Sequence, residues 1–460
     1  MSTFINNGEI AKVGIGEQYQ DFIARVLNAK EIFEEKDLFI KEKDPTVKTI
    51  TFQVTEACNL RCTYCYQINK SPAVLSLETA KEFIDLLIES SYDENNKLWI
   101  GTTSGIVMEF IGGEPLLEIE LVDQIVDYFR VRLIQENHPW VHYNAISFIS
   151  NGVKYFDDKV QAFLNKNKDI VSFAISLDGN KELHDSCRVF PDGSGSYDLA
   201  VAGCKHYMEN YNPNMYTKMT FAPENISSTY DAFVNLVSLG YKYIHANPVY
   251  EDVWCLDDAK LYYKELKRVA DFLIEDDRYK DVQTAIFNNE SFCPCDPKDN
   301  QNYCGSTGCM VSVDYNGFIY PCVRFMKSSL GKNVEPFIIG DVKHGIGVLP
   351  EHKEKIDILD SITRMSQSSE KCNNCQIGAG CGWCTAYNYQ VTGTPNKRLE
   401  TICEMHQARS LANVYFWNKI YRKEGANDRF IMHIPKDWAL EIINEEEYNM
   451  LLELTKPKDA

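Results

Sequence analysis

Short β-branched or aromatic runs alternate with amphipathic stretches of helical period from about residue 49 to residue 276. Such alternation is typical of βα units around a parallel sheet. The predicted strands are Thr49–Thr55, Ile106–Ile111, Ala145–Ile149, Val171–Ser176, Lys218–Phe221 and Tyr243–Asn247. The predicted helices are Leu77–Ser90, Glu118–Gln135, Asp157–Lys166, Ser196–Glu209, Thr229–Leu239 and Asp257–Asp276. Six units are too few for a closed eight-unit barrel, so we expect an α/β fold with a partial (β/α)6, TIM-like barrel.

The remaining segments differ in character. Residues 1–48 form a polar N-terminal extension with one predicted helix around Tyr19–Phe33. Residues 277–410 are rich in Cys, Gly and Asn, which predicts a domain held by metal rather than by an apolar core. A C-terminal helical tail, 411–460, completes the chain, with helices expected over Glu404–Arg422 and Trp438–Leu454. The barrel is therefore expected to occupy residues 49–276.

Charge and hydropathy exclude several classes of protein. The net charge of −19 is spread along the 460 residues, which argues against a nucleic-acid or anionic-lipid surface. A solvated acidic surface and a basic peptide partner both remain compatible with this charge. No apolar stretch reaches about eighteen residues, and no basic segment followed by an apolar one opens the chain. We therefore expect a cytoplasmic protein, in which sixteen clustered cysteines hold metal rather than form disulfides.

The first cysteine group, Cys58, Cys62 and Cys65, directly follows the first predicted strand. Three thiolates within eight residues can converge on one ion or cluster. A structural zinc site needs four protein ligands, whereas an iron–sulfur cluster held by three cysteines leaves one iron open. A zinc knuckle with a distant fourth ligand remains the alternative.

This CxxxCx(aromatic)C spacing at the end of a first barrel strand resembles the radical S-adenosylmethionine (SAM) superfamily. In that family the open iron binds SAM, and a reduced cluster generates a 5′-deoxyadenosyl radical that removes a hydrogen atom from the substrate. The resemblance implies that Cys58, Cys62 and Cys65 hold a catalytic 4Fe–4S cluster. SAM would be the cofactor that carries the organic chemistry.

Residues after the later strands complete the resemblance. Gly112-Gly113-Glu114-Pro115 is similar to the family's GGEP segment, which binds the SAM amino group, although such a turn also occurs as an ordinary strand-to-helix loop. Arg188 is similar to an arginine that pairs with the SAM carboxylate. Tyr64 would pack beside the adenine, or simply in the loop. The implied SAM contacts are Tyr64, Gly112, Gly113, Glu114, Pro115, Ser150, Asn151, Ser176, Asp178 and Arg188.

The later cysteines resemble a SPASM domain, an extension of radical SAM enzymes with a small β-hairpin, helices and two auxiliary clusters. The first auxiliary cluster would use Cys304, Cys309, Cys322 and Cys384. The second would use Cys372, Cys375, Cys381 and Cys403. Cys381 and Cys384 are separated by two residues instead of the usual three. Full protein ligation would favour electron relay, and a pair of zinc sites is the alternative.

Five cysteines remain outside these sets: Cys187, Cys204, Cys255, Cys293 and Cys295. Cys204 fits a buried thiol in a helix. The Cys293-Pro294-Cys295 segment could cap a cluster or touch the substrate, and its sequence does not decide between these roles.

The resemblance extends from about Thr49 to Arg409, and Gly378–Gln390 with Gly393–Arg398 resembles maturases of Cys-xxx-repeat peptides. It implies sactipeptide- or ranthipeptide-like thioether formation in a ribosomally made precursor. Formylglycine formation, carbon–carbon cross-linking and a non-enzymatic metal-binding scaffold are the alternatives. Flavodoxin or ferredoxin would donate electrons. The 48 residues before the first strand are too few for the family's winged-helix recognition domain. Leader recognition is therefore expected from a truncated version of that domain, from a separate leader-recognition protein, or from the cluster domain and the C-terminal helices.

Overall fold

The computed structural model describes residues 3–6, 9–12, 47–91 and 105–457, so the helix predicted around Tyr19–Phe33 lies outside the described residues. The chain divides into two compact units. Unit 1 comprises Met1–Ser176, Val189–Pro213 and Tyr303–Ile362, and unit 2 comprises Leu177–Arg188, Asn214–Asn302 and Thr363–Ala460. These units reflect packing and do not test the functional domains expected from the sequence, which stay a prediction.

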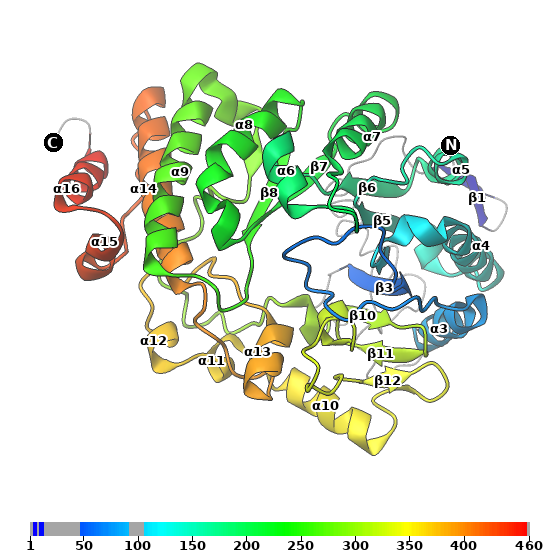
Figure 1. The fold of residues 1–460 in the computed structure, drawn as a ribbon. Helices are drawn as coiled ribbons and strands as arrows, with labels where there is room; N and C mark the ends of the chain where they lie inside the picture. Colours follow the sequence, from blue (N-terminus) through cyan, green and yellow to red (C-terminus); the bar gives the residue numbers. More distant parts are fainter. Residues whose placement is uncertain (1–2, 7–8, 13–46, 92–104, 458–460) are drawn as a thin grey trace. The chain divides into compact units, whose positions relative to one another are not determined.

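Unit 1 is built on an eight-stranded mixed sheet (Figure 1). Four parallel strands match the first four predicted ones: β3 (Lys48–Thr55), β4 (Ile106–Gly112), β5 (Asn144–Ser150) and β6 (Val171–Ile175). On the other side of β3 the sheet continues through β10 (Met310–Val313), β11 (Phe318–Tyr320), β12 (Gly340–Asp341) and β13 (Gly345–Ile346). Strand β10 is parallel to β3, and the last three form an antiparallel meander. A separate hairpin joins β1 (Thr3–Asn6) to β2 (Glu9–Lys12).

One face of this sheet is packed with aromatic side chains. Phe52, Phe110 and Phe148 are in register on β3, β4 and β5, and their rings stack with centroids 5.5 and 5.3 Å apart. Cross-strand aromatic pairs of this kind stabilise neighbouring strands. Helices α3 (Leu77–Ser90), α4 (Ile119–Gln135) and α5 (Asp158–Asn167) lie along the same side of the sheet, and α7 (Tyr197–Asn210) packs on β6 (Figure 1).

Because side chains alternate along a strand, the other face carries a different set. Thr51, Glu109 and Ser147 are in register across the same strands, and the Thr51 hydroxyl donates to the Glu109 carboxylate at 2.8 Å. Glu109 and Ser147 are half-buried, whereas their neighbours Phe110 and Phe148 are fully buried. The sheet therefore has one apolar face towards the helices and one polar face. The loops that carry the predicted site residues follow the carboxyl ends of its parallel strands.

Unit 2 contains a three-stranded parallel sheet of β7 (Tyr216–Phe221), β8 (Tyr243–Pro248) and β9 (Gln283–Thr284). Strands β7 and β8 match the last two predicted strands. Helix α9 (Leu256–Ile274) packs against α8 (Thr229–Ser238), α14 (Cys403–Glu424) and α15 (Lys436–Ile442), and α14 also contacts α16 (Glu445–Leu454). None of the helices in 47–91 and 105–457 has the length and apolar character needed to cross a bilayer.

Shorter elements join these parts. Unit 1 also contains α10 (Pro350–Asp360), η1 (Pro115–Glu118), η2 (Pro139–Val141), η5 (Gly305–Thr307) and η6 (Val323–Phe325). Unit 2 also contains α6 (Lys181–Cys187), α11 (Arg364–Gln367), α12 (Glu370–Asn373), α13 (Thr385–Thr392), η3 (Pro223–Ser228) and η4 (Glu275–Lys280).

Two expectations about the second half of the chain are wrong. Residues 277–410 were expected to be held by metal rather than by an apolar core, yet within this range Val311, Ile319 and Phe325 are fully buried, because β10 extends the main sheet. The tail helix expected over Trp438–Leu454 is interrupted between α15 and α16. The Asn444 side chain accepts from the Glu447 amide at 2.8 Å and so starts a new helix.

Candidate active site

The first cysteine loop follows β3 at the carboxyl edge of the unit 1 sheet. Cys58, Cys62 and Cys65 are each half-buried. The Leu60 amide donates to the Cys58 sulfur at 3.4 Å, and the Cys65 amide donates to the Cys62 carbonyl at 3.3 Å. The Arg61 guanidinium donates to the Cys58 carbonyl at 2.7 Å. These contacts fold the loop back on itself at the end of β3.

Two glycines let the next loop pack directly on this one. The Gly113 amide donates to the Thr55 carbonyl at 3.0 Å. A Cβ at Gly113 would lie 2.2 Å from the Ala57 carbonyl oxygen and 2.8 Å from the Cβ of Cys58, and one at Gly112 would lie 2.4 Å from the Thr55 oxygen. The absence of a side chain at both positions is therefore what permits the contact between the two loops.

Glu114 connects the loops after β4 and β5. Its side chain is 1% exposed. One carboxylate oxygen accepts from the Leu116 amide at 3.1 Å and from the Ser150 hydroxyl at 2.7 Å. The other accepts from the Asn151 amide at 2.8 Å. The carboxylate thus binds three donors of the protein itself, and its predicted contact with SAM remains a prediction.

Asn151 extends this network to the cysteine loop. Its side-chain nitrogen, Nδ2, donates to the Asn59 side chain at 2.7 Å and lies 3.9 Å from the Cys58 sulfur. Its side-chain oxygen, Oδ1, accepts from the Val153 amide at 3.0 Å. Burial raises the pKa of the Cys58 thiol, and the Lys70 charge opposes that rise. The network therefore ends at one of the three sulfurs.

The remaining predicted SAM contacts are divided between the units. In unit 1, Tyr64 is half-buried on the cysteine loop, and Pro115 begins η1. The amide of Ser176 donates to the Ser150 carbonyl at 2.8 Å, so Ser176 belongs to the same edge. Asp178 and Arg188 lie in unit 2. The structure thus brings the cysteine loop, Gly112, Gly113, Glu114, Ser150, Asn151 and Ser176 together within one unit.

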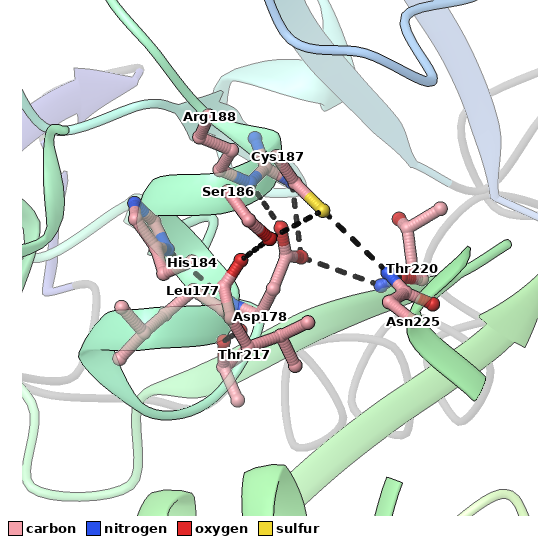
Figure 2. A network of polar contacts seen from close by, with 10 residues as sticks. Leu177, Asp178, His184, Ser186, Cys187, Arg188, Thr217, Thr220 and Asn225 are labelled. Carbon is pink, nitrogen blue, oxygen red and sulfur yellow. Dashed lines mark hydrogen bonds and ion pairs between the residues drawn. The ribbon is translucent and has the colours of Figure 1, made fainter. Parts of the chain in front are cut away.

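Within unit 2, Asp178 and Arg188 form a buried ion pair with two contacts (Figure 2). The guanidinium donates to the carboxylate at 2.7 Å through Nε and at 3.3 Å through Nη2. The Thr220 amide donates to the same carboxylate at 3.4 Å. This fork geometry is the strong form of a charge-assisted hydrogen bond. Arg188 is predicted to bind the SAM carboxylate, and in the structure it binds a carboxylate of the chain itself, that of Asp178.

Three further residues, His184, Asn225 and Cys187, belong to the same network of polar contacts. The His184 ring accepts from the Asp178 amide at 3.4 Å, and its burial, with the Arg188 charge, lowers its pKa to about 4. The Asn225 side chain lies 3.7 Å from the Cys187 sulfur and donates to the Thr220 carbonyl at 3.2 Å (Figure 2). Cys187, for which no role was predicted, is therefore a buried member of this network.

Three cysteines of the predicted first auxiliary set belong to unit 1, and the fourth, Cys384, belongs to unit 2. Cys304 precedes η5, Cys309 precedes β10, and Cys322 follows β11, whose antiparallel pairing leads the chain back towards the start of β10. The Cys309 carbonyl accepts from the Thr49 amide at 3.0 Å, which ties this set to β3. Cys384 caps α13 in unit 2, with the Tyr387 amide donating to its sulfur at 3.4 Å.

The second auxiliary set lies wholly in unit 2. Its four cysteines line one cavity whose empty space, including the part open to solvent, is about 530 Å³. Cys372 is on α12, Cys403 begins α14, and Cys375 and Cys381 lie on the loop between α12 and α13. In the described part of the chain no three His, Cys, Asp or Glu are grouped as ligands of a single metal ion.

Charged side chains surround these sulfurs. The Arg398 guanidinium donates to the Cys381 sulfur at 2.7 Å and lies over the Trp383 ring, 4.4 Å from its centroid. The Glu400 carboxylate accepts from the Cys372 sulfur at 3.6 Å and pairs with Lys371 at 2.9 Å. These residues contribute a dense polar wall to an otherwise apolar cavity.

Burial strongly affects the thiols of this set. It raises the pKa of Cys381 to about 11 and that of Cys403 to about 12, the Arg398 charge opposing the first rise. Without metal these thiols are neutral near pH 7, so they become ligands only where iron displaces their protons. Four cysteines line this cavity, and its one histidine, His406, donates to the Ile377 carbonyl, so the donor type fits an iron–sulfur cluster.

Sequence reasoning missed several residues of these sites. Asn59 contacts Asn151 from within the CxxxC motif, and Asn225 contacts Cys187. Arg398 belongs to the Gly393–Arg398 run that was singled out only as a resemblance. The sequence did contain a signal for Arg398: it is a positively charged residue between Cys384 and Cys403 in a chain whose net charge is −19.

Residues 47–182 match the family described as "4Fe-4S single cluster domain" (Fer4_12). An uncharacterised protein of Methanocaldococcus jannaschii is 27% identical over 43% of this chain, which spans 61% of that relative. The mycofactocin maturase of Mycolicibacterium smegmatis is 25% identical over 75% of this chain and 80% of its own length. A cysteine-type anaerobic sulfatase-maturating enzyme of Clostridium perfringens is 24% identical over 60% of this chain and 74% of its own.

Solved structures agree on the fold. The structure entitled native anSMEcpe with bound AdoMet is similar with a TM-score of 0.59 at 15% identity, covering 82% of this chain and 100% of that one. Streptococcus suis SuiB bound to precursor peptide SuiA has a TM-score of 0.52 at 14% identity, covering 82% and 79%. These matches confirm the α/β fold with a largely parallel sheet. Together the comparisons support the radical SAM/SPASM-type maturase family, an enzyme with SAM and iron–sulfur clusters as cofactors.

Proposed function

We propose that this enzyme installs thioether cross-links, from cysteine sulfur to carbon, in a ribosomally made, cysteine-rich precursor peptide. Cys58, Cys62 and Cys65 would hold a 4Fe–4S cluster, which together with SAM would supply the radical chemistry for hydrogen-atom abstraction. Over the whole reaction the peptide loses the S–H and one C–H hydrogen and gains one C–S bond. The residues below bind, orient and shield; the organic chemistry belongs to the cofactor.

The single observation that carries the proposal is the loop arrangement in unit 1. Three cysteines at a strand end leave one coordination position for SAM, and Gly113 brings a second loop against them. Glu114 fixes the Ser150–Asn151 loop with two hydrogen bonds, and the Asn151 side chain lies 3.9 Å from the Cys58 sulfur. We infer that this edge orients SAM, with Tyr64 beside the adenine.

Arg188 and Asp178 are also proposed to bind SAM. Arg188 is held by Asp178 in a buried fork, so its guanidinium is oriented before a ligand arrives. We therefore keep Arg188 and Asp178 as SAM-binding residues of the proposal.

The later cysteines would hold two auxiliary clusters that accept the electron released when the C–S bond closes. Their predicted full ligation suits a relay, and flavodoxin or ferredoxin is the proposed outside donor. In unit 1 the Arg324 guanidinium, two residues after Cys322, lies 5.1 Å from the centroid of the Tyr66 ring, which directly follows Cys65. We propose a cytoplasmic location and, for the leader peptide, a separate recognition protein.

The test uses anaerobically reconstituted enzyme, SAM, a strong reductant and a precursor rich in cysteine. We expect 5′-deoxyadenosine and a peptide that has lost two hydrogens per bridge with every sulfur retained. The Cys58→Ala, Cys62→Ala and Cys65→Ala triple variant should produce no deoxyadenosine while keeping its auxiliary iron. Deoxyadenosine formation by that variant would refute the site, and a protein loaded with zinc would refute the mechanism.

Formylglycine formation is the second candidate, because a cysteine-type sulfatase-maturating enzyme is among the relatives. It also removes two hydrogens from a cysteine but replaces sulfur with oxygen. High-resolution mass spectrometry therefore separates the two reactions. A cross-link between two carbons would retain free thiols, which iodoacetamide labelling detects.

A further inference from the structure

The Cys293-Pro294-Cys295 segment lies in unit 2 against the loop of the second auxiliary set. The Phe292 amide donates to the Ala379 carbonyl, and the Ala379 amide donates to the Cys293 carbonyl, both at 2.9 Å. The Phe292 ring packs on His406, 4.9 Å between centroids. This pair of reciprocal backbone bonds fixes the segment to the chain between Cys375 and Cys381.

Gly378 shows how near the extra sulfur comes to a predicted ligand. A Cβ built at Gly378 would lie 3.0 Å from the Cys295 sulfur and 3.6 Å from the Cβ of Cys375. The two cysteines therefore border the same small space, which stays open because residue 378 has no side chain. Burial raises the pKa of the Cys295 thiol, while the charges of Arg364 and Arg398 oppose the rise.

We propose that Cys295 is a fifth sulfur ligand available to the second auxiliary cluster, able to replace Cys375 on one iron. The inference rests on the proposed function, since it needs a cluster at this set. The exchange is redox-neutral: the Cys295 thiol gives up its proton when it binds iron, and the Cys375 thiolate takes one up when it leaves. One iron would thereby have two alternative protein ligands.

The other members of the set have different neighbours and supply the control. The Cys372 sulfur donates to Glu400 at 3.6 Å, and the Cys381 sulfur accepts from Arg398 at 2.7 Å. Cys372 is on α12 and, unlike Cys375, is not among the nearest neighbours of the Cβ position at Gly378 that Cys295 contacts. Removal of Cys372 should therefore not be rescued by Cys295.

The experiment compares full-length, anaerobically reconstituted Cys375→Ala, Cys372→Ala, Cys295→Ala and Cys375→Ala/Cys295→Ala proteins. Iron and sulfide per chain and the EPR signal of the reduced protein are measured. We expect Cys375→Ala and Cys295→Ala to keep wild-type iron, and Cys372→Ala and the double variant to lose one cluster, about four irons. Cys375→Ser with and without Cys295→Ala repeats the comparison should the alanine variants fold poorly.

Equal iron loss in Cys375→Ala and the double variant would overturn the fifth ligand and leave the proposed function intact. If the Cys372→Ala variant instead binds as much iron as the wild type, no cluster forms at this set. That outcome would overturn the inference together with the auxiliary relay.

Discussion

The first cysteine loop in unit 1 and the second auxiliary set in unit 2 surround their sulfurs differently. The hydrogen-bond donors to the Cys58 sulfur are a backbone amide and the neutral side chain of Asn151. The Cys381 sulfur accepts from the guanidinium of Arg398, and the Cys372 sulfur donates to the carboxylate of Glu400. The first group has three cysteines on one loop, and the second has four around one cavity.

This difference separates two tasks that the same metal chemistry can perform. Neutral dipoles and a missing fourth cysteine leave a site open to a charged cofactor. Charged hydrogen bonds to ligand sulfurs, a closed ligand set and burial instead tune a reduction potential. We therefore assign substrate chemistry to the first site and electron transfer to the second, and the predictions below are ordered by expected size.

Gly113→Ala should have the largest effect and should be confined to the first site. Its Cβ would lie 2.2 Å from the Ala57 oxygen, so the cysteine loop must move. We expect deoxyadenosine formation to fall about a hundredfold, the usual cost of a small misplacement of reacting groups. Gly331→Ala, whose Cβ would make an ordinary 3.7 Å contact with Val334, is the matched control. Equal activity of the two variants would contradict the loop contact.

Acid should weaken unit 2 through His406. The ring donates to the Ile377 carbonyl at 2.6 Å, and burial lowers its pKa to about 3. Because the unfolded chain binds this proton at a higher pH, stability is lost as the pH falls from about 6.5 towards 3. We expect a loss of about 2 kcal/mol in unfolding free energy between pH 7 and pH 5.

Urea unfolding of wild type and His406→Gln at both pH values checks this expectation. Glutamine keeps a donor for the Ile377 carbonyl but does not titrate. A variant with the same pH dependence as wild type would show that other groups control the acid response.

Glu114→Gln should weaken SAM binding without affecting the second site. The amide group would replace one oxygen that now accepts from Ser150 or Asn151, which leaves a buried donor facing another. Such a mismatch costs about 1–3 kcal/mol, so we expect SAM affinity to fall about tenfold. Titration with SAM measures it, and Glu120→Gln, a surface carboxylate paired with Lys159, is the control. Unchanged affinity would remove Glu114 from the SAM site.

Arg398→Gln should give the smallest effect and confine it to the second site. Loss of the charged donor to Cys381 disfavours the more negative, reduced cluster. We expect the midpoint potential to fall by about 50 mV, a little over 1 kcal/mol for one electron. An EPR-monitored titration gives the value, and Arg398→Lys should restore part of it. A potential equal to wild type would show that Arg398 only packs on Trp383.

The strands of the fold were predictable because their hydrophobic periods are local, and all six expected strands are present. The pairing of β10 with β3 was not, since no local pattern reveals a partner 261 residues away. The tail helix was predicted too long because apolar periodicity continues across Ile443, while the stop depends on the Asn444 cap.

The cysteine sets and the Gly112–Pro115 turn were found from spacing and resemblance, and their cofactors agree with the comparisons. The roles of the individual SAM contacts stay predictions. Asn59, Arg398 and Asn225 escaped notice because each acts through a contact formed only by folding. Asp178 and Arg188 were identified, but their mutual ion pair could not be read from two residues ten positions apart.

Strand β10 also constrains the order in which the molecule is made. Until Met310–Val313 has left the ribosome, β3 carries an unpaired edge directly ahead of the cysteine loop. Contacts of such long sequence separation form late, and an open strand edge invites aggregation. A cluster inserted into the Cys58–Cys65 loop during synthesis would therefore bind before β3 has paired with β10. We expect cluster insertion to follow the completion of this sheet.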